Sequence, residues 1–312
     1  MIKYFEFEKE IEKIDLLIKN LEAEDKKDIS KIKKLNLEKN QIFEKIYSNL
    51  TPWQKVQISR HNDRPHTMDY LINIFQDIVY LHGDKKYSDD NAIIGGFAKI
   101  NNQSVVFIGT EKGNSMESRI KHNFGMAKPE GYRKAQRLVK LGEKFNLPVI
   151  TFVDTAGAFP GKDAEERGQS ESIASSILEF LNVIAPTISI IIGEGGSGGA
   201  IGIAASDRVL MLEHSTYSVI SPEGCASILW RSTDFSQEAA NTLKLTAQDC
   251  KKYQIIDEII PELPGGAHRN LLEQSVIVKN TIFKNIEALL KVSLDDLVKE
   301  RKQKYLNITS NI

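Results

Sequence analysis

The spacing of apolar positions differs between regions of the chain, and the N-terminal region has a pattern of its own. Over the first fifty residues, apolar side chains recur at helical spacing, among them Ile11, Ile14 and Ile18, and Lys and Glu fill most positions between them. This pattern predicts a helical hairpin over residues 1–50 that turns at about Asp25–Asp28. Such a charge-laced hairpin is either an interface for a partner chain or a solvated pair packed on its own domain.

From about residue 91, short apolar runs alternate with amphipathic stretches. Runs over 93–100 and 104–109 predict a β-hairpin that turns at Asn101–Asn102. The elements expected after it are a helix over 129–146, a strand over 148–153, a helix over 163–182, strands over 187–192, 208–213 and 216–220, and helices over 236–247, 270–292 and 294–305. Because strands alternate with helices, we expect an α/β protein. We divide it into the hairpin of 1–50, an α/β core over 51–262 and C-terminal helices over 263–312.

The densest chemical signal is a glycine string over 193–199, which holds five glycines in seven residues. It follows a strand-like run over 188–192 and precedes a short helical stretch over 201–205. Glycine lets a ligand approach the backbone closely. Backbone N–H groups at a helix start can also hold a developing negative charge. We therefore expect an anion or oxyanion site here.

A second loop of small residues, Asp154–Gly161, follows the run over 148–153. A helix is expected to begin after it, with Asp163 and Glu166 as a capping box. The chain thus has two successive strand–loop–helix units, whose backbone N–H groups can converge on one oxyanion. A P-loop at Gly161–Lys162 is excluded, because the upstream glycine is one position too close and no Ser or Thr follows the lysine.

The glycine string also fits two other motifs. Gly193–Gly198 with Glu213 matches a dinucleotide fingerprint, but the segment between them holds only about two helical turns, too short for a full crossover helix. Gly195–Gly199 matches a nucleophile elbow, with Ser197 as the nucleophile and His268 as a possible base of a serine hydrolase. Alternatively, Ser197 is simply a small residue that lets two backbones approach each other.

Composition narrows the functional classes. The 312 residues include 41 Lys and Arg against 42 Asp and Glu, so no overall charge recruits nucleic acid or an anionic membrane surface. No apolar run has the length of a membrane span, and the first eight residues carry acids rather than a signal-peptide core. We therefore expect a cytoplasmic protein without membrane contact. In that compartment Cys225 and Cys250 are expected to be free thiols with structural roles.

Basic residues gather over 112–137, where they could meet an anionic ligand or form a solvated helix face. A second basic and histidine-rich segment lies over 60–66, but its spacing fits no strong zinc pattern, so no metal is expected in this chain. Asp154 is expected to order its own loop, and Glu223 to be a capping or loop residue.

Five longer segments together resemble the alpha subunit of the bacterial acetyl-CoA carboxylase carboxyltransferase. They lie at 60–67, 124–135, 154–161, 193–200 and 218–230, and the similarity runs from about residue 50 to residue 257. Two departures are visible. Phe159 stands where the family usually has tyrosine, so the hydroxyl is missing, and Ala127–Lys128 replaces the usual proline–arginine.

The resemblance implies a crotonase (ClpP/crotonase-like) fold of repeated ββα units and transfer of a carboxyl group from N1-carboxybiotin to acetyl-CoA, which gives malonyl-CoA for fatty acid synthesis. It assigns the backbone N–H groups of Gly198 and Gly199 to the biotin ureido oxygen, where one such donor is typically worth about 3 kcal/mol. Supporting residues are Ala200, Gly157 and Ala158, and residues near the biotin are Gly195, Gly196, Ser197 and Phe159. No side-chain base is required, because biotin itself takes the proton.

The resemblance also implies partners. The chain has no Met-Lys-Met biotin attachment motif, no C-x-x-C pair and no evident ATP-binding motif. The implied partners are therefore a carrier protein that holds biotin covalently, a zinc-ribbon beta subunit in an α2β2 assembly, and a separate biotin carboxylase. The chain is expected to be active only with the beta subunit. A non-catalytic scaffold whose hairpin binds partners is the remaining alternative.

Overall fold

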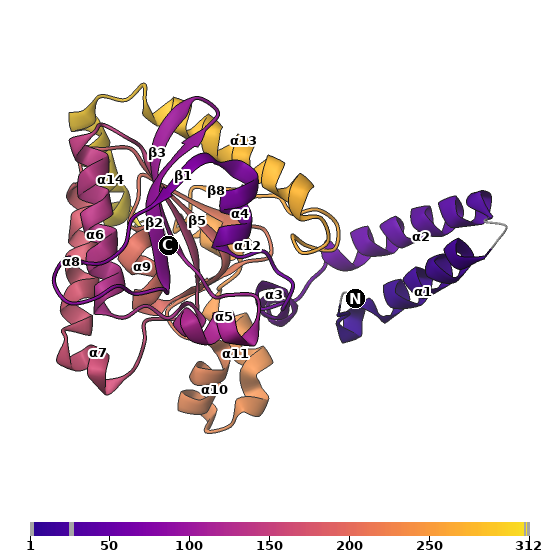
Figure 1. Ribbon diagram of the computed structural model, residues 1–312. Coiled ribbons are helices and arrows are strands. Elements are labelled where there is room, and N and C mark those ends of the chain that lie inside the picture. Colours follow the sequence, from indigo (N-terminus) through magenta and orange to yellow (C-terminus); the bar gives the residue numbers. More distant parts are fainter. Residues whose placement is uncertain (1–2, 25–27, 309, 311–312) are drawn as a thin grey trace.

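The computed structural model describes residues 3–24, 28–308 and 310. One mixed sheet lies between two layers of helices, as Figure 1 shows. Its strand order is β1-β2-β3-β4-β5-β6-β8, and β7 pairs with β5 off this path. The strands are β1 (Gln76–Tyr80), β2 (Ile93–Ile100), β3 (Gln103–Thr110), β4 (Val149–Thr155), β5 (Thr187–Gly196), β6 (Arg208–Leu212), β7 (Thr216–Ser218) and β8 (Glu258–Ile260). This arrangement confirms the α/β class.

Most of the longer helices lie where amphipathic patterns predicted them, whereas the helices over 67–74, 116–121, 222–230 and 247–252 were not predicted. The first seven helices are α1 (Lys9–Ala23), α2 (Ile29–Tyr47), α3 (Pro52–Ser59), α4 (Thr67–Ile74), α5 (Met116–Lys121), α6 (Pro129–Lys144) and α7 (Lys162–Glu166). The others are α8 (Gln169–Asn182), α9 (Ser197–Ala204), α10 (Pro222–Trp230), α11 (Ser236–Leu243), α12 (Ala247–Lys252), α13 (Leu271–Leu289) and α14 (Leu294–Asn307). Short 3₁₀ turns lie at Glu6–Glu8, Asn123–Gly125 and Thr233–Phe235.

The strands from β3 to β6 and β8 run parallel, whereas β1, β2 and β3 form an antiparallel meander. The expected hairpin turning at Asn101–Asn102 is confirmed, and Asn101 adopts φ 51° there. The central strands are buried on both faces, as their continuous apolar runs indicate. One core cluster includes residues of α6, α8 and α9, and another includes residues of α4 and α13. Among the described residues, no helix is long and apolar enough to cross a membrane.

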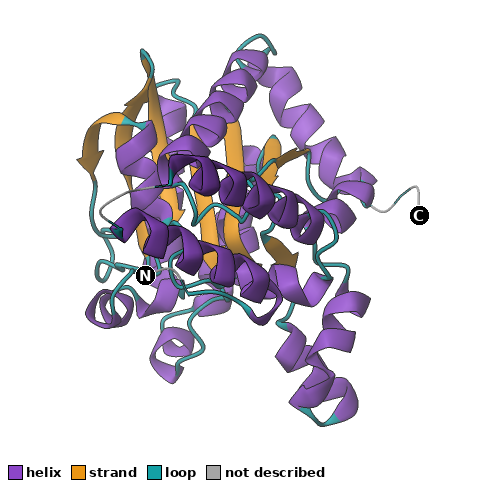
Figure 2. Ribbon diagram, turned by 90° about the vertical axis from the view of Figure 1, so that its right-hand side faces the viewer, coloured by secondary structure: helices purple, strands orange, loops and turns teal. Residues whose placement is uncertain are grey.

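The N-terminal hairpin is confirmed as α1 and α2, and it stands away from the body of the molecule in Figure 1. Figure 2 views it from the side on which it projects, so that it lies in front of the sheet. Residues 25–27 of its expected turn lie outside the described residues, as do Met1 and Ile2. Its base is fixed by Glu8, which is fully buried and accepts hydrogen bonds from Tyr47 (2.8 Å) and Arg269 (2.7 Å). The three-domain division of the chain stays a prediction.

The single helix expected over 163–182 is wrong, because the chain breaks it into α7 and α8. Gly168 lies between them with φ +80°, a left-handed conformation that glycine adopts readily. The expected capping box is also absent: Gly161 is the N-cap residue of α7, without a side-chain cap. Asp163 instead pairs with Lys128 at 3.2 Å. A similar break follows α11, where Lys244 has φ +52°, so the helix expected over 236–247 ends at Leu243.

Candidate functional site

The two small-residue loops meet at the carboxyl edge of the sheet. Strands β4 and β5 are parallel neighbours, and their pairing extends to Thr155 opposite Gly195. Strand β5 continues through Gly196, because residues 194–196 pair with β7 after the earlier part of the strand has paired with β6. The first four residues of the glycine string are therefore strand rather than loop, which corrects the expectation. Only the part from Ser197 onward opens α9.

Gly198 and Gly199 lie in the first turn of α9. N–H groups in the first turn of a helix have no partner within the helix. Gly196 is the N-cap residue, and no side chain caps this end. Ser197 adopts φ +50° at the turn from strand to helix and is exposed, whereas Gly199 is buried. The helix start therefore offers backbone donors at the sheet edge, as an oxyanion site requires.

The two loops touch through their backbones, which explains the glycines. A Cβ placed on Gly199 would lie 2.5 Å from the carbonyl carbon of Gly157 and 2.6 Å from the nitrogen of Ala158. A Cβ on Gly196 would lie 2.2 Å from the carbonyl oxygen of Ala156. Real Cβ atoms do not approach backbone this closely, because protein interiors are close-packed. By contrast, a Cβ on Gly198 would meet only Ile173 at 3.6 Å, an ordinary contact.

A buried charged cluster supports both loops. Asp154, at the end of β4, is 1% exposed and accepts a hydrogen bond from the backbone N–H of Glu194 at 2.9 Å. The ammonium of Lys112 lies 2.8 Å from Asp154 Oδ1 and 2.7 Å from Glu194 Oε2. Burial raises the pKa of Asp154, but Lys112 and His66 outweigh it, so the pKa lies well below its usual range. Asp154 therefore orders the neighbouring glycine string rather than only its own loop.

Arg60 extends this cluster to the next helix. Its guanidinium contacts Glu194 at 2.6 Å and Glu223 at 2.5 Å. Glu223 is the second residue of α10, so Arg60 links the glycine string to that helix start. A cleft of about 210 Å³ opens beside the cluster, and its lining includes Arg60, Lys112, Ala156 and Glu194.

Arg64 also holds strand β5. It is 2% exposed and donates to the carbonyl of Ile192, the residue before the glycine string, at 2.8 Å. Two further donors reach the carboxylate of Glu262 at 2.7 and 3.0 Å. Together, Arg60 and Arg64 engage the carboxylates of Glu194, Glu223 and Glu262. Within the described residues, no group of three His, Cys, Asp or Glu side chains is placed to hold a metal ion.

The remaining predicted site residues lie around the two loops. Ala200 is fully buried in the core, and Gly157 has φ +153°. Gly195 packs against Tyr217, which a Cβ would approach to 2.7 Å. The ring of Phe159 lies under the ammonium of Lys128, at 4.8 Å from its centroid. The structure thus gathers the nine predicted residues at one edge of the sheet, and their individual roles stay predictions.

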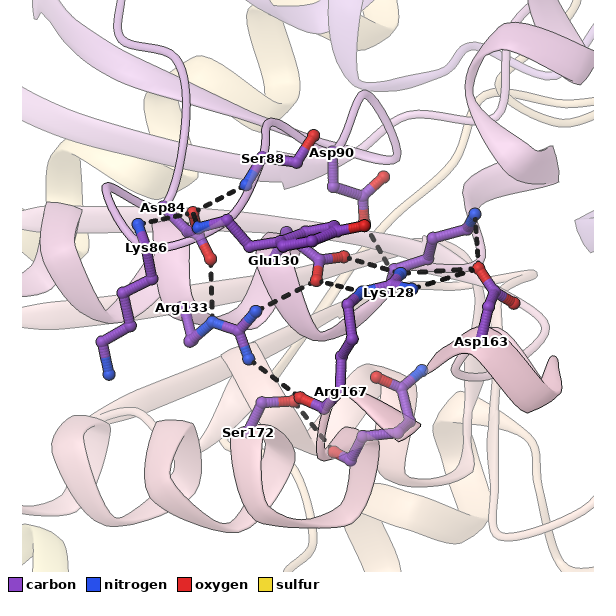
Figure 3. Close-up of polar contacts among 12 residues, drawn as sticks. Asp84, Lys86, Ser88, Asp90, Lys128, Glu130, Arg133, Asp163, Arg167 and Ser172 are labelled. Carbon is purple, nitrogen blue, oxygen red and sulfur yellow. Dashed lines mark hydrogen bonds and ion pairs between the residues drawn. The ribbon is translucent and has the colours of Figure 1, made fainter. Parts of the chain in front are cut away.

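Three of the basic residues over 112–137 are held by carboxylates, whereas Lys121 is exposed. Lys112 is enclosed by the cluster described above, and Lys134 is buried against Asp89 at 2.5 Å. Figure 3 shows Arg133 reaching Asp84, a contact of 2.8 Å. These side chains hold the fold together, so the expectation of an anion-binding or solvated face is wrong for them.

Ser197 has no catalytic partner among the described residues. The hollow beside it, of about 240 Å³, is lined by Ser197, Gly198, Ile201, Tyr217, Ser218, Val219 and Ile255. His268 was expected in an exposed turn but is buried, stacked on His61 with 4.1 Å between ring centroids. Neither of its ring nitrogens has a hydrogen-bond partner in the described part of the chain. The strand-to-helix turn thus resembles a nucleophile elbow only in its backbone.

The burial of His268 gives a testable pH dependence of stability. Burial, His61 and Arg269 lower the pKa of His268 from 6.5 to about 2. Below pH 6.5 the unfolded chain binds a proton that folded His268 refuses, so this residue destabilises the fold as the pH falls, by up to about 1.4 kcal/mol per pH unit. His268→Phe is expected to flatten this dependence in urea unfolding between pH 7 and pH 5. Parallel stability curves for the variant and the wild type would contradict the expectation.

The sequence did not point to the charged cluster of Arg60, Lys112, Asp154 and Glu194 as one unit. Its members come from four separate segments, and the contact between Arg60 and Glu194 spans 134 positions. The available signals were an aspartate at the end of a buried strand and a glutamate inside the glycine string. Neither signal shows which lysine or arginine pairs with the carboxylate.

Comparisons with known proteins agree with this geometry. A family profile described as acetyl co-enzyme A carboxylase carboxyltransferase-like matches residues 4–309. A protein from Halalkalibacterium halodurans named acetyl-coenzyme A carboxylase carboxyl transferase subunit alpha is 51% identical over 277 residues, which are 89% of this chain and 85% of that protein. A protein of the same name from Rhodospirillum centenum is 50% identical over 309 residues, or 98% of each chain.

Solved structures resemble the fold at low sequence identity. A transcarboxylase 12S with methylmalonyl-coenzyme A and methylmalonic acid bound has a TM-score of 0.59 and 17% identity; the match covers 77% of this chain and 45% of that chain. A Pseudomonas malonate decarboxylase hetero-tetramer in complex with coenzyme A has a TM-score of 0.56 and 14% identity, with 69% and 86% covered. The expected crotonase-like fold is thereby confirmed.

Proposed function

Because the chain belongs to the family of acetyl-CoA carboxylase carboxyltransferase alpha subunits, which it matches over residues 4–309, we propose that it forms the biotin-side half of that enzyme. The enzyme is a carboxyltransferase that acts on a coenzyme A thioester. The single observation that carries the assignment to this half-site is the uncapped helix start at Gly198 and Gly199, where Gly199 packs against the loop at Gly157.

The residues present fit a ureido oxygen. Gly198 and Gly199 have N–H groups without helical partners, and the contact with Gly157 and Ala158 leaves no room for a side chain on Gly199. Carboxybiotin would supply the carboxyl group, and the N–H groups of Gly198 and Gly199 would hold the negative charge that its release places on the ureido oxygen. Backbone donors held in place before the reaction stabilise such charge without reorganisation. Ala200 and the loop residues keep these donors in position.

The proposed partners follow from this division of labour. A zinc-ribbon beta subunit supplies the acetyl-CoA side, within an α2β2 assembly. A carrier protein presents biotin that a separate biotin carboxylase has charged. The name "subunit alpha" of the relatives supports a beta partner. Gly195, Gly196, Ser197 and Phe159, which lie around the helix start, are proposed to face the biotin.

The test is the reverse reaction. We expect the chain mixed with a beta subunit to form acetyl-CoA from malonyl-CoA in the presence of biocytin, and neither subunit to do so alone. Ser197→Ala is expected to keep turnover within about threefold, because backbone donors rather than a hydroxyl carry the negative charge. Loss of activity in Ser197→Ala, together with ester hydrolysis by the chain alone, would instead indicate a serine hydrolase.

A further inference from the structure

The loop that packs against Gly199 has few anchors of its own. The Thr155 hydroxyl donates to the carbonyl of Gly157 at 2.7 Å and accepts from its N–H at 3.1 Å. At the other end, the N–H of Phe159 donates to the carbonyl of Ala127 at 2.9 Å. The loop is partly exposed between these points. A contact from outside the loop is therefore needed to fix the position of the loop relative to Gly199.

One buried amide ties this far end in place. Gln169, the first residue of α8, is 3% exposed, and its Nε2 donates to the carbonyls of Ala127 at 2.8 Å and Phe159 at 3.0 Å. The two hydrogens of the amide thus satisfy two carbonyls from different segments. Its Oε1 has no partner among the described residues, so the donor end of this side chain is the part that the fold uses.

The corner that carries Gln169 is itself held rigidly. Arg167 donates to Glu130 at 2.7 and 3.3 Å, and Arg133 donates to the same carboxylate at 3.0 Å. Figure 3 shows Glu130 between these two guanidinium groups. Glu130 is 2% exposed, so α6 and the α7–α8 corner are joined by a buried ion cluster. Gly168 then turns the chain so that Gln169 begins α8.

We propose that Gln169 is a positioning residue: its amide sets the position of loop 157–159 against Gly199 and thereby the geometry of the helix-start donors. The inference rests on the proposed function for its kinetic consequence, but its structural part stands alone. Because the contacts between Gly199 and the loop are already at backbone packing distance, a displacement of the loop by a few tenths of an ångström alters them.

The kinetic test replaces the donor by an acceptor. Gln169→Glu in the complex with the beta subunit is expected to lower kcat at least about 10-fold at pH 8, with the KM for malonyl-CoA unchanged. A buried carboxyl group that faces two carbonyls has a raised pKa and can donate one hydrogen bond when protonated. We therefore expect its kcat relative to wild type to recover partly as the pH falls towards 6, whereas Gln169→Met shows no such recovery.

The matched control is Gln136→Glu. Gln136 on α6 also donates its amide to a backbone carbonyl of α8, that of Ser172 at 3.0 Å, but it does not touch the loop. The kcat of Gln136→Glu is expected to stay within about twofold of wild type. The thermal stability of this variant is expected to be similar to that of Gln169→Glu. Equal kcat losses in Gln136→Glu and Gln169→Glu, or a Gln169→Glu loss with the same pH profile as Gln169→Met, would overturn the proposal.

Hydrogen exchange separates this inference from the proposed function. In Gln169→Met, amides of residues 157–159 are expected to exchange at least about 10-fold faster than in wild type and in Gln136→Glu. Unchanged exchange would overturn the positioning role even if Gln169→Glu failed to fold. If the wild-type complex transferred no carboxyl group, the proposed function would fail, and the exchange result would still decide the role of Gln169.

Discussion

Gly199→Ala is expected to lower kcat for carboxyl transfer at least about 100-fold, the loss typical of removing an oxyanion donor. The new Cβ would lie 2.5 Å from the backbone of Gly157 and 2.6 Å from that of Ala158. Backbone cannot rotate out of the way as a side chain can, so the loop and the start of α9 must move apart. The measurement is the reverse reaction in the reconstituted complex, together with the thermal unfolding of the variant.

The control for this prediction is Gly202→Ala on the same helix. Its Cβ would lie 2.8 Å from the buried ring of Tyr132, so the variant is also overpacked, but the contact lies away from the loop at Gly157. Overpacking of this kind typically costs about 1–3 kcal/mol of stability. We expect both variants to lose stability and only Gly199→Ala to lose turnover. Equal kcat losses in the two would mean that turnover follows stability rather than loop geometry.

Lys112→Met is expected to reduce the free energy of unfolding by about 3–5 kcal/mol, because it leaves two carboxylates without their shared cation in a buried site. Asp154 is 1% exposed, and Lys112 lies within 2.8 Å of it and 2.7 Å of Glu194. Urea unfolding measures the loss. We also expect turnover to fall. Without Lys112, the buried carboxyl group of Asp154 is no longer kept ionised, so its hydrogen bond from the N–H of Glu194 is weaker.

The cost of Lys112→Met is expected to depend on pH. In the wild type, the pKa of Asp154 lies below its usual range, so the stabilisation is present at neutral pH and is lost as the pH falls below about 4. Without Lys112, burial raises the pKa, so the variant differs most from wild type at pH 7 and less at low pH. Lys284→Met removes an exposed partner of Glu258 and is expected to cost at most about 1 kcal/mol. A comparable loss of unfolding free energy in Lys112→Met and Lys284→Met would contradict a larger contribution from the buried cluster.

The long, regular elements could be predicted from the sequence because their signals are local. The hairpin of α1 and α2, the β2–β3 turn at Asn101 and the alternation of strands and helices from β4 to α9 follow from periodicity and turn chemistry. The short elements β1, β8, α4, α5, α10 and α12 were missed, because three to nine residues carry too little pattern. The break at Gly168 was missed for another reason: a single glycine inside an amphipathic stretch does not reveal its φ of +80°.

The candidate site divides in the same way. The glycines were found because their density is visible in seven consecutive residues. The sequence does not show why each position must be glycine. Gly196 and Gly199 are required because they contact Ala156 and Gly157 in another loop. Likewise, Asp154 was noticed at a strand end, but nothing in the sequence says which cation lies beside it. Contacts between distant segments are what a linear pattern cannot supply.

The buried contact between Arg64 and Glu262 has a consequence for how the chain is made. The two residues are 198 positions apart, and Arg64 also needs the carbonyl of Ile192. At about 5–20 residues per second on a ribosome, roughly 10–40 s pass between the synthesis of the arginine and that of its carboxylate. During that interval Arg64 lacks its partner Glu262. Strand β5 therefore cannot pack against an Arg64 guanidinium whose charge is neutralised. The buried charge of Arg64 is thus paired with a carboxylate only after strand β8 and Glu262 have been made.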